Sequence, residues 1–297
     1  TSPLVLAVDL GSGGPKIGYV RVTGEPEWWW HERGDILAES ISQDANTWWT
    51  TIVTAAQRGL AEGVDPARVV GVAVSGQWAS TVPVDADGIP VGNCLMWSDT
   101  HGAKHSAKRF GGPISGYDAR VLATWLRRSG GVPSHTGSDP VSHMLYLLND
   151  CPDIVEKARW FIEPVDYVAM RFSGKASASA MSMTAAWLTD NRNLNKHEYD
   201  AKLVRMAGVD ASYLPPLVPA ASLIGAIQPE VADLIGLPHL DPHLHFDGGP
   251  IDRFFVGAVP HRDGPKVLGG ECVRTFQGDL PHLPTPYCIE VDEQLGS

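Results

Sequence analysis

The sequence predicts an α/β fold in which helices flank a mixed β-sheet, and three observations support this. Residues 4–8 and 17–22 are apolar runs separated by a glycine-rich segment, a pattern typical of two adjacent strands. Residues 69–75 form another apolar run with the length of a buried strand. A helical pattern lies between these strands. The resulting order, with three antiparallel strands before the first helix, differs from that of a doubly wound dinucleotide-binding fold.

The segment between the opening strands and residue 69 is expected to contain a third strand and a helix. The strand is predicted over residues 35–40 and the helix over residues 47–62. Either Asp44 or Asn46 can cap the helix, because both side chains accept hydrogen bonds from the N–H groups of a first turn. Four apolar side chains of this helix are expected to face the core: Trp48, Ile52, Ala55 and Leu60.

After residue 75 the pattern predicts a hairpin followed by helices. Residues 80–84 and 89–97 are expected to pair across an Asp-Ala-Asp-Gly turn at residues 85–88. Four helices are expected farther along the chain, at residues 119–128, 141–149, 152–158 and 231–235. A loop-rich segment that begins at Pro215 and Pro216 precedes the last of these helices.

Composition and charge narrow the class of protein. The chain has 297 residues, of which 43% are hydrophobic and 19% charged, so it has room for one large or two ordinary globular domains. Its net charge of −11 disfavours a surface for nucleic acid or an anionic membrane, since both need basic patches. No apolar run approaches the ~18 residues of a membrane span, and no signal-peptide pattern opens the chain. Four scattered cysteines without a C-x-x-C pair predict a reduced, cytoplasmic protein with neither zinc site nor disulfide framework.

The segment that joins the first two strands carries the groups of a phosphate site. Asp9 ends the first apolar run, and Gly11, Ser12, Gly13 and Lys16 follow it. Glycines leave backbone N–H groups accessible, Ser12 can donate to phosphate oxygens, Lys16 adds a positive charge, and Asp9 can hold a hydrated divalent cation. The alternative is an ordinary hairpin turn. A P-loop and a dinucleotide fingerprint are both disfavoured, because the glycine and lysine spacing of neither is present.

Two runs of tryptophans, at residues 28–30 and 48–49, allow two interpretations. They could form a platform on which a carbohydrate stacks, or they could pack against the core as large aromatic side chains more often do. We expect packing.

Five collinear segments resemble the FGGY family of carbohydrate kinases, and its xylulokinase-like members most closely. The first is the Asp-Leu-Gly-Ser-Gly-Gly-Pro-Lys segment, which resembles the first phosphate motif of that family. The others are residues 71–77 with 84–88, the Trp-Ser-Asp segment at 97–99, residues 161–182, and residues 214–238. Each is weak by itself, but their common order along the chain makes the family assignment strong.

The resemblance implies an actin-like, ribonuclease-H-type fold in which ATP and a sugar meet in a cleft between two domains. Residues 1–240 would be the sugar-binding domain, and residues 241–297 the incomplete start of the ATP-binding domain. The implied activity is ATP-dependent phosphorylation of a sugar hydroxyl with Mg²⁺, a ketopentose such as xylulose being favoured, and weak or absent in this chain alone. The alternatives are a non-catalytic sugar-binding module and an actin-like scaffold. The implied partners are the sugar and ATP, and a homodimer is left open.

Site residues carried over from the family fall into three groups. Gln77, Trp78, Trp97 and Asp99 would bind the sugar. A catalytic aspartate is expected after a Gly-Gly pair and before a helix, and Asp252 fits that order while Asp247 fits the downstream spacing. Gly269 and Gly270 occupy the place of a second phosphate turn.

This chain departs from the family pattern in three segments that bear on substrate and nucleotide. Trp78 and Ala79 stand where xylulokinases typically have Met-His, and His101 stands where an arginine is common. Glu271 follows the second glycine pair where hydroxyl residues are usual, and its negative charge near phosphates is electrostatically unfavourable. The identity of the sugar therefore stays open.

Overall fold

The computed structural model describes residues 2–11, 13–32, 41–193, 195–220 and 222–238, together with the backbone of three strands at residues 255–260, 272–274 and 288–290. Within these residues the chain forms a mixed five-stranded sheet, a set of helices on that sheet, and a second, mainly helical lobe. The predicted α/β class is confirmed.

The central sheet has the strand order β13-β5-β1-β2-β3. Strands β1 (Leu4–Gly11), β2 (Gly14–Arg21) and β3 (Pro26–His31) form an antiparallel meander. Strand β5 (Val69–Gly76) pairs in parallel with β1, and β13 (Phe255–Pro260) pairs in parallel with β5. The predicted order of three antiparallel strands, a helix and a further strand is therefore confirmed.

The opening hairpin is tighter than the sequence suggests. Gly11 pairs with Gly14, so the strands extend into the segment predicted as a turn. Lys16 consequently lies in β2, directly opposite Asp9. Gly14 has a φ of 117°, a conformation that glycine adopts without steric cost.

The third strand lies earlier in the chain than predicted. Strand β3 contains the tryptophan run at residues 28–30, and aromatic side chains suit a pleated, half-buried surface. The strand predicted at residues 35–40 lies outside the described residues. Trp48 and Trp49 are buried, Trp28 and Trp30 pack against the core, and Trp29 is exposed. The packing interpretation of the tryptophans is thus confirmed for all but Trp29.

Helix α1 (Ala45–Ala61) begins two residues before the predicted start. Asp44 caps it, because the Asn46 backbone N–H donates to the Asp44 Oδ1 at 2.9 Å. Trp48, Ile52 and Ala55 are buried as predicted, whereas Leu60 is only partly buried. This buried face packs on the sheet together with α6 (Pro164–Ser173) and α8 (Pro229–Ile235).

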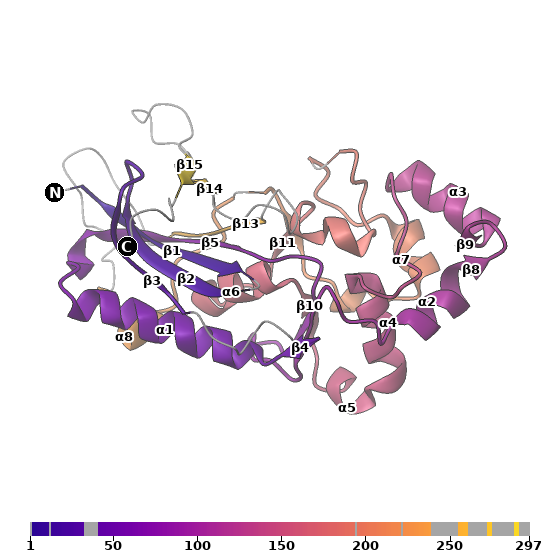
Figure 1. Cartoon of the computed structure of the whole chain (residues 1–297), viewed down its shortest axis with the longest axis horizontal. Coiled ribbons are helices and arrows are strands. Elements are labelled where there is room, and N and C mark those ends of the chain that lie inside the picture. Colours follow the sequence, from indigo (N-terminus) through magenta and orange to yellow (C-terminus); the bar gives the residue numbers. More distant parts are fainter. Residues whose placement is uncertain are drawn as a thin grey trace.

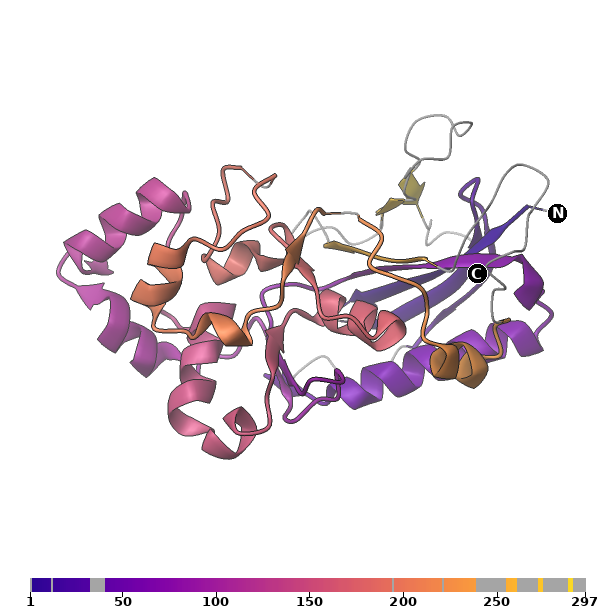
Figure 2. The same cartoon turned by 180° about the vertical axis from the view of Figure 1, so that it is seen from behind.

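The other lobe consists mainly of helices around a second apolar core. Its helices are α2 (Ala103–Phe110), α3 (Ala119–Arg128), α4 (Pro140–Asp150), α5 (Pro152–Val155) and α7 (Ala201–Ala207). Figure 1 shows an elongated molecule, with α1 and the sheet toward one end and α2, α3 and α7 toward the other. Seen from behind in Figure 2, α8 lies against α1.

The remaining elements are short. Strands of two or three residues are β4 (Ser42–Gln43), β6 (Val82–Val84), β7 (Cys94–Leu95), β8 (Gly111–Gly112), β9 (Gly116–Tyr117), β10 (Trp160–Ile162), β11 (Ala178–Ser179), β12 (Leu217–Val218), β14 (Cys272–Arg274) and β15 (Cys288–Glu290). Single 3₁₀ turns occur at Pro66–Arg68, Ser182–Ala186 and Ala211–Tyr213. The predicted hairpin around residues 85–88 is present, with antiparallel bridges from Thr81 to Leu95 and from Val84 to Pro90.

Helix prediction succeeded where apolar periodicity was strong. The helix at residues 119–128 has its predicted bounds, while α4 and α8 differ from prediction by one or two residues at an end and α5 ends at residue 155 instead of 158. Helices α2, α6 and α7 were not predicted. The helix expected after Asp252 was also wrong, because residues 255–260 form β13, whose apolar residues pair with β5.

Two further findings concern membrane-spanning helices and the cysteines. Within the described ranges, no helix is long and apolar enough to cross a membrane. Cys94 and Cys151 are free thiols, and Cys94 is buried.

Asp166, in the first turn of α6, is a buried carboxyl without a basic partner among the described ion pairs. Its Oδ2 is shielded from solvent and has no hydrogen-bond partner among the residues that the structure describes. Burial raises the pKa of Asp166 to about 7, although a hydrogen bond with Ser182 acts in the opposite direction. The folded state therefore favours the protonated carboxyl.

We predict that Asp166 makes the chain less stable as pH rises. Below pH 3.8, the pKa of Asp166 in the unfolded chain, Asp166 is protonated in both the folded and the unfolded state. Its full contribution to the free energy of unfolding is then present. Between the unfolded value of 3.8 and about 7 only the unfolded state ionises, so stability is lost, by up to about 4 kcal/mol. In urea unfolding at pH 5 to 8, Asp166→Asn should therefore gain stability over the wild type with rising pH. The exposed Asp87→Asn should show no such trend, and a pH-independent difference for Asp166→Asn would contradict the assignment.

Helix α1 lies close against the sheet at Gly59. A Cβ at this position would lie 2.6 Å from Cε2 of Tyr19 and 2.8 Å from Cε3 of Trp28. Neither ring is free to yield, because the Tyr19 hydroxyl donates to the Ala56 carbonyl and the Trp28 indole N–H donates to Glu62. A side chain at residue 59 would therefore push the helix away from the sheet.

We predict that Gly59→Ala destabilises the chain, although glycine-to-alanine changes inside helices usually stabilise by about 1 kcal/mol. The steric conflict with two rings should outweigh this propensity gain and cost about 1–3 kcal/mol net. Chemical denaturation followed by circular dichroism measures the change. Thr54→Ala, on the exposed face of the same helix, serves as the control and should be close to neutral.

Candidate functional site

The carboxyl ends of β1 and β5 meet at one edge of the sheet, because the two strands run in parallel. Asp9 of β1 lies beside Ser75 of β5 and opposite Lys16 of β2. The Ser75 hydroxyl donates to the Asp9 Oδ1 at 2.9 Å, and the Lys16 Nζ lies 3.9 Å from the Asp9 Oδ2. Asp9 is only 6% exposed, so these contacts fix its carboxylate at the edge of the sheet.

The hairpin beside Asp9 has room for a phosphate group. A Cβ on Gly13 would meet nothing within 4 Å, and one on Gly11 would lie 3.7 Å from the Asp9 Oδ2. Lys16, with 30% of its side chain exposed, brings a positive charge to the same place. A hydrated Mg²⁺ needs only one or two protein carboxylates, so Asp9 fits that role. The described residues of this candidate nucleotide site therefore suit phosphate and Mg²⁺ chemically.

Gln77 lies at the same sheet edge. Its backbone N–H donates to the Leu10 carbonyl of β1 at 2.8 Å, which continues the β1–β5 pairing by one residue. Its side-chain Oε1 is shielded from solvent and has no hydrogen-bond partner within the described part of the chain. Because buried polar atoms are normally satisfied, this oxygen is a candidate acceptor for a ligand hydroxyl.

The loop after β5 is joined to the segment that contains Trp97. The Ser80 hydroxyl accepts a hydrogen bond from the Trp97 backbone N–H at 3.0 Å. Ser80 is buried, whereas the Trp97 side chain is 46% exposed. Trp78 is half-buried. The structure thus joins two of the predicted sugar-binding segments, residues 77–78 and residue 97, through one serine.

Asp99, which is predicted to bind the sugar, is held by the residues of its own loop. It is fully buried, and its Oδ1 accepts the His101 backbone N–H at 2.8 Å. Both carboxylate oxygens lie 3.0 Å from the His101 Nδ1. The His101 ring, half exposed, stacks on Tyr146. A ligand approaching this loop would meet His101 before the Asp99 carboxylate, and the role of Asp99 stays a prediction.

His143 of α4 lies beneath the same loop. Its Nε2 lies 3.3 Å from the Asp99 carbonyl oxygen and its Nδ1 lies 3.3 Å from the Thr81 Oγ1. Burial lowers the pKa of His143 to about 4, so the ring is neutral near pH 7. A neutral ring can accept from one neighbour and donate to the other, which ties the two segments together.

Sequence reasoning missed Glu163, which lies at the start of α6. Its carboxyl is buried, and the Glu163 Oε2 accepts the Ser80 backbone N–H at 3.3 Å. Burial raises the pKa of Glu163 well above its usual value. One sequence signal could have found it, because Glu163 is an acidic residue within an otherwise apolar run just before Pro164.

Several predicted site residues cannot be placed in this geometry. Ser12, Asp247, Asp252, Gly269 and Gly270 lie outside the described residues, so the catalytic aspartate and the second phosphate turn stay predictions.

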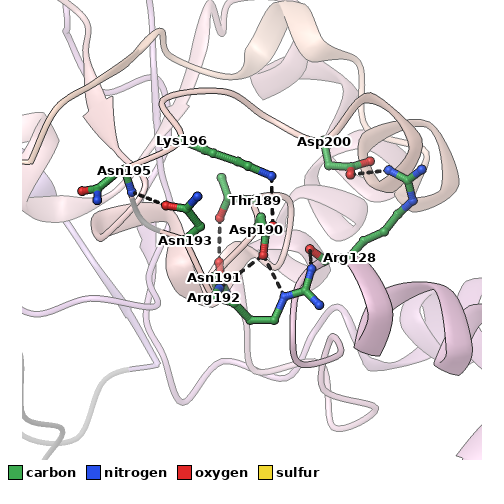
Figure 3. Close-up of polar contacts among 9 residues, drawn as sticks. All are labelled: Arg128, Thr189, Asp190, Asn191, Arg192, Asn193, Asn195, Lys196 and Asp200. Atoms are coloured by element: carbon green, nitrogen blue, oxygen red, sulfur yellow. Dashed lines mark hydrogen bonds and ion pairs between the residues drawn. The ribbon is translucent and has the colours of Figure 1, made fainter.

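A cavity of about 200 Å³ lies away from the predicted site, on the helical lobe. It is lined by charged side chains of both signs, Arg127, Arg128, Asp190, Arg192, Lys196, Glu198 and Asp200. Figure 3 shows that Arg128 pairs with Asp200 and that Arg192 and Lys196 both pair with Asp190. Hydrogen bonds from Arg192 and Lys196 lower the pKa of Asp190 to about 2. Three of the four cations are thus already engaged in ion pairs, so we do not assign this cavity to substrate.

Comparison with curated proteins finds sugar kinases. The chain is 24% identical over 208 residues to a gluconokinase of Bacillus subtilis, covering 68% of this chain and 37% of the relative. It is 27% identical over 198 residues to a xylulose kinase of Streptomyces coelicolor, covering 66% of this chain and 37% of the relative. The chain therefore spans well under half the length of these curated relatives.

Solved structures show the same fold. The crystal structure of xylulose kinase from Rhodospirillum rubrum matches with a TM-score of 0.66 at 18% identity, over 87% of this chain and 48% of that one. Plasmodium falciparum glycerol kinase with ADP matches with a TM-score of 0.67 at 13% identity, with the same coverage. The fold is that of these sugar kinases, which are actin-like ATPase folds.

The family resemblance drawn from the five motifs is tested directly by a family profile. Residues 25–242, which form most of the chain, match the FGGY family of carbohydrate kinases, N-terminal domain. The match includes the loop of Gln77, the segment at Trp97 and Asp99, and helix α6. This chain belongs to the FGGY family of carbohydrate kinases.

Proposed function

We propose that this chain is the sugar-binding part of an ATP-dependent carbohydrate kinase, and that its substrate is a neutral ketopentose such as xylulose. One observation carries the proposal. The parallel pairing of β1 and β5 puts the candidate nucleotide site at Asp9 next to Gln77, whose Oε1 is buried and lacks a described partner. A kinase needs this adjacency, because the phosphoryl donor and the acceptor hydroxyl must be held in line.

Each described residue has a separate task in this proposal. Bound ATP with Mg²⁺ supplies the phosphoryl group. The backbone of Gly11 and Gly13 leaves room for phosphate oxygens, while Lys16 contributes positive charge and Asp9 would hold the hydrated metal ion. On the acceptor side, Gln77 would accept a sugar hydroxyl, and Trp97 offers an exposed aromatic face. Trp78 and the Asp99–His101 pair complete the candidate sugar wall.

The charge of this wall favours a neutral sugar over a sugar acid. The two segments that form it, residues 77–80 and 97–101, contain no lysine or arginine. Recognition of a carboxylate normally uses such cations, most often arginine in bidentate geometry. His101 also replaces the arginine common in the family. A ketopentose therefore suits the wall better than gluconate, although relatives of this chain include gluconokinases as well as xylulose kinases.

The division of the chain follows the same proposal. Residues 1–240 would form the sugar-binding domain, and residues 241–297 would begin the ATP-binding domain, with Asp252 or Asp247 as general base and Gly269 and Gly270 at a second phosphate turn. The family match over residues 25–242 supports the first boundary. The runner-up is a sugar-binding module without turnover. A reducing cytoplasmic location remains a prediction from the scattered cysteines.

Sugar binding tests the proposal first. Isothermal titration with xylulose, ribulose, glycerol and gluconate should show that the chain prefers a ketopentose. Gln77→Ala should weaken that affinity by about 1–3 kcal/mol, because it removes one partner of a buried hydrogen bond. Gln57→Ala, which changes a glutamine on α1, is the matched control and should leave affinity unchanged. No binding of any sugar, or equal affinity for Gln77→Ala and wild type, would refute the proposed site.

Nucleotide chemistry tests the second half of the proposal. Asp9→Ala should weaken MgATP binding while leaving sugar affinity unchanged, since Asp9 belongs to the nucleotide side of the sheet edge. The exposed Asp87→Ala is the control. Sugar-stimulated ADP release by this chain alone should be far below the ~10 s⁻¹ typical of enzymes, because transfer depends on two domains closing over the reactants. Turnover near that rate would show that the residues after 240 suffice.

A further inference from the structure

The loop between Gln77 and Ser80 contains a strained residue. Ala79 has a φ of 63°, in the left-handed region that residues other than glycine rarely adopt. Besides Ala79, the described non-glycine residues with positive φ are Ser115 and Trp187. Such a conformation persists only when its surroundings determine it, so some contact must hold this loop in place.

The buried side chain of Glu163 makes that contact. Its Oε2 accepts the backbone N–H of Ser80 at 3.3 Å. The carboxyl thus holds the residue that directly follows the strained Ala79. The Ser80 hydroxyl in turn accepts the Trp97 N–H, so the contact extends from Glu163 through Ser80 to the second segment of the sugar wall.

Glu163 is itself rigidly placed. It directly follows β10, which pairs with β6 so that Ile162 lies opposite Val82. It also directly precedes Pro164, the first residue of α6. A strand and a helix therefore fix the residue on both sides, and the side chain is 1% exposed.

No ion pair in the described structure accounts for the burial of the Glu163 carboxyl. None of the described ion pairs involves Glu163, and its Oε1 has no hydrogen-bond partner. A buried carboxyl without a cation costs stability, and an apolar residue at the start of α6 would avoid that cost. Its raised pKa indicates a neutral carboxyl, which can still accept N–H groups through its carbonyl oxygen. The buried Glu163 carboxyl therefore indicates a role in positioning the loop.

We propose that Glu163 is a positioning residue that holds Ala79 in its left-handed conformation and thereby places Gln77 and Trp78 beside Trp97 to bind sugar. This inference rests on the proposed function for the ligand, but the structural clamp can be measured without it. Glu163 acts through the loop and does not itself touch the sugar.

The sugar affinity of Glu163 variants, measured beside a control variant, tests the clamp. Glu163→Leu should weaken ketopentose binding about tenfold or more, because the Ser80 N–H loses its buried acceptor. Glu163→Gln keeps an acceptor oxygen and should stay within about threefold of wild type. MgATP affinity should not change in either. Asp166→Asn, which alters a buried carboxyl one turn along α6, is the matched control and should leave sugar affinity unchanged.

A second-site change separates positioning from general destabilisation. Glycine adopts positive φ without steric cost, so adding Ala79→Gly to Glu163→Leu should recover most of the lost sugar affinity. A variant that was merely less stable would not regain affinity by this route. If circular dichroism shows that Glu163→Leu does not fold, Glu163→Asp, which withdraws the carboxyl by one methylene, should give an intermediate loss.

Hydrogen exchange tests the clamp even if the chain binds no sugar, an outcome that would refute the proposed function alone. The Ser80 amide should exchange at least about tenfold faster in Glu163→Leu, or in Glu163→Asp, than in wild type. The neighbouring Thr81 amide, which donates to the Leu95 carbonyl at 2.9 Å, is the internal control and should not change. Unchanged Ser80 exchange, or unchanged sugar affinity in a folded variant of a sugar-binding wild type, would overturn the inference.

Discussion

The parallel pairing of β1 with β5 is the constraint on which the rest of the candidate site depends. It places Asp9 next to Ser75 and allows the Gln77 N–H to reach the Leu10 carbonyl, so the ends of two distant segments meet at one sheet edge. The antiparallel pairing of β1 with β2 adds Lys16 opposite Asp9. If either pairing shifted by one residue, the Asp9 side chain would point to the other face of the sheet, because strand side chains alternate. The register of these two strand pairs therefore determines which side chains meet at the candidate site.

Buried polar groups fix the positions of the loops beside the sheet edge. Glu163 holds the backbone at Ser80, Ser80 holds Trp97, and His143 lies between Thr81 and Asp99. Burying such groups is expensive, as the raised pKa of Glu163 and the lowered pKa of His143 both indicate. A purely structural core could have used apolar residues at lower cost. Glu163 and His143 both lie beside the candidate sugar wall, which is where a single, fixed loop geometry has most value for binding.

Local patterns predicted the elements whose apolar periodicity is strong, and failed where tertiary packing decides. The run at residues 69–75 and the helix at residues 119–128 are recognisable alone, whereas α6 is buried nearly all round. Strand β3 was missed because its tryptophans were interpreted only as a carbohydrate platform or as packing on the core. In the site, motifs identified Asp9, Gln77 and Trp97, but no sequence rule could show that His101 covers the Asp99 carboxylate or that Glu163 reaches the Ser80 backbone, since both depend on packing.

The central claim is that sugar binds where the loops at residues 77–80 and 97–101 meet the edge of the β1–β5 pair. Indole N–H resonances of assigned tryptophans test this most directly, because Trp78 and Trp97 lie in those loops. Trp125 lies in the helical lobe, where its indole donates to the Trp187 carbonyl at 3.0 Å. Titration with xylulose should shift the Trp78 and Trp97 signals in a saturable way and leave Trp125 unchanged. Saturable shifts confined to Trp125, or sugar binding measured by calorimetry with no change at Trp78 and Trp97, would contradict the account.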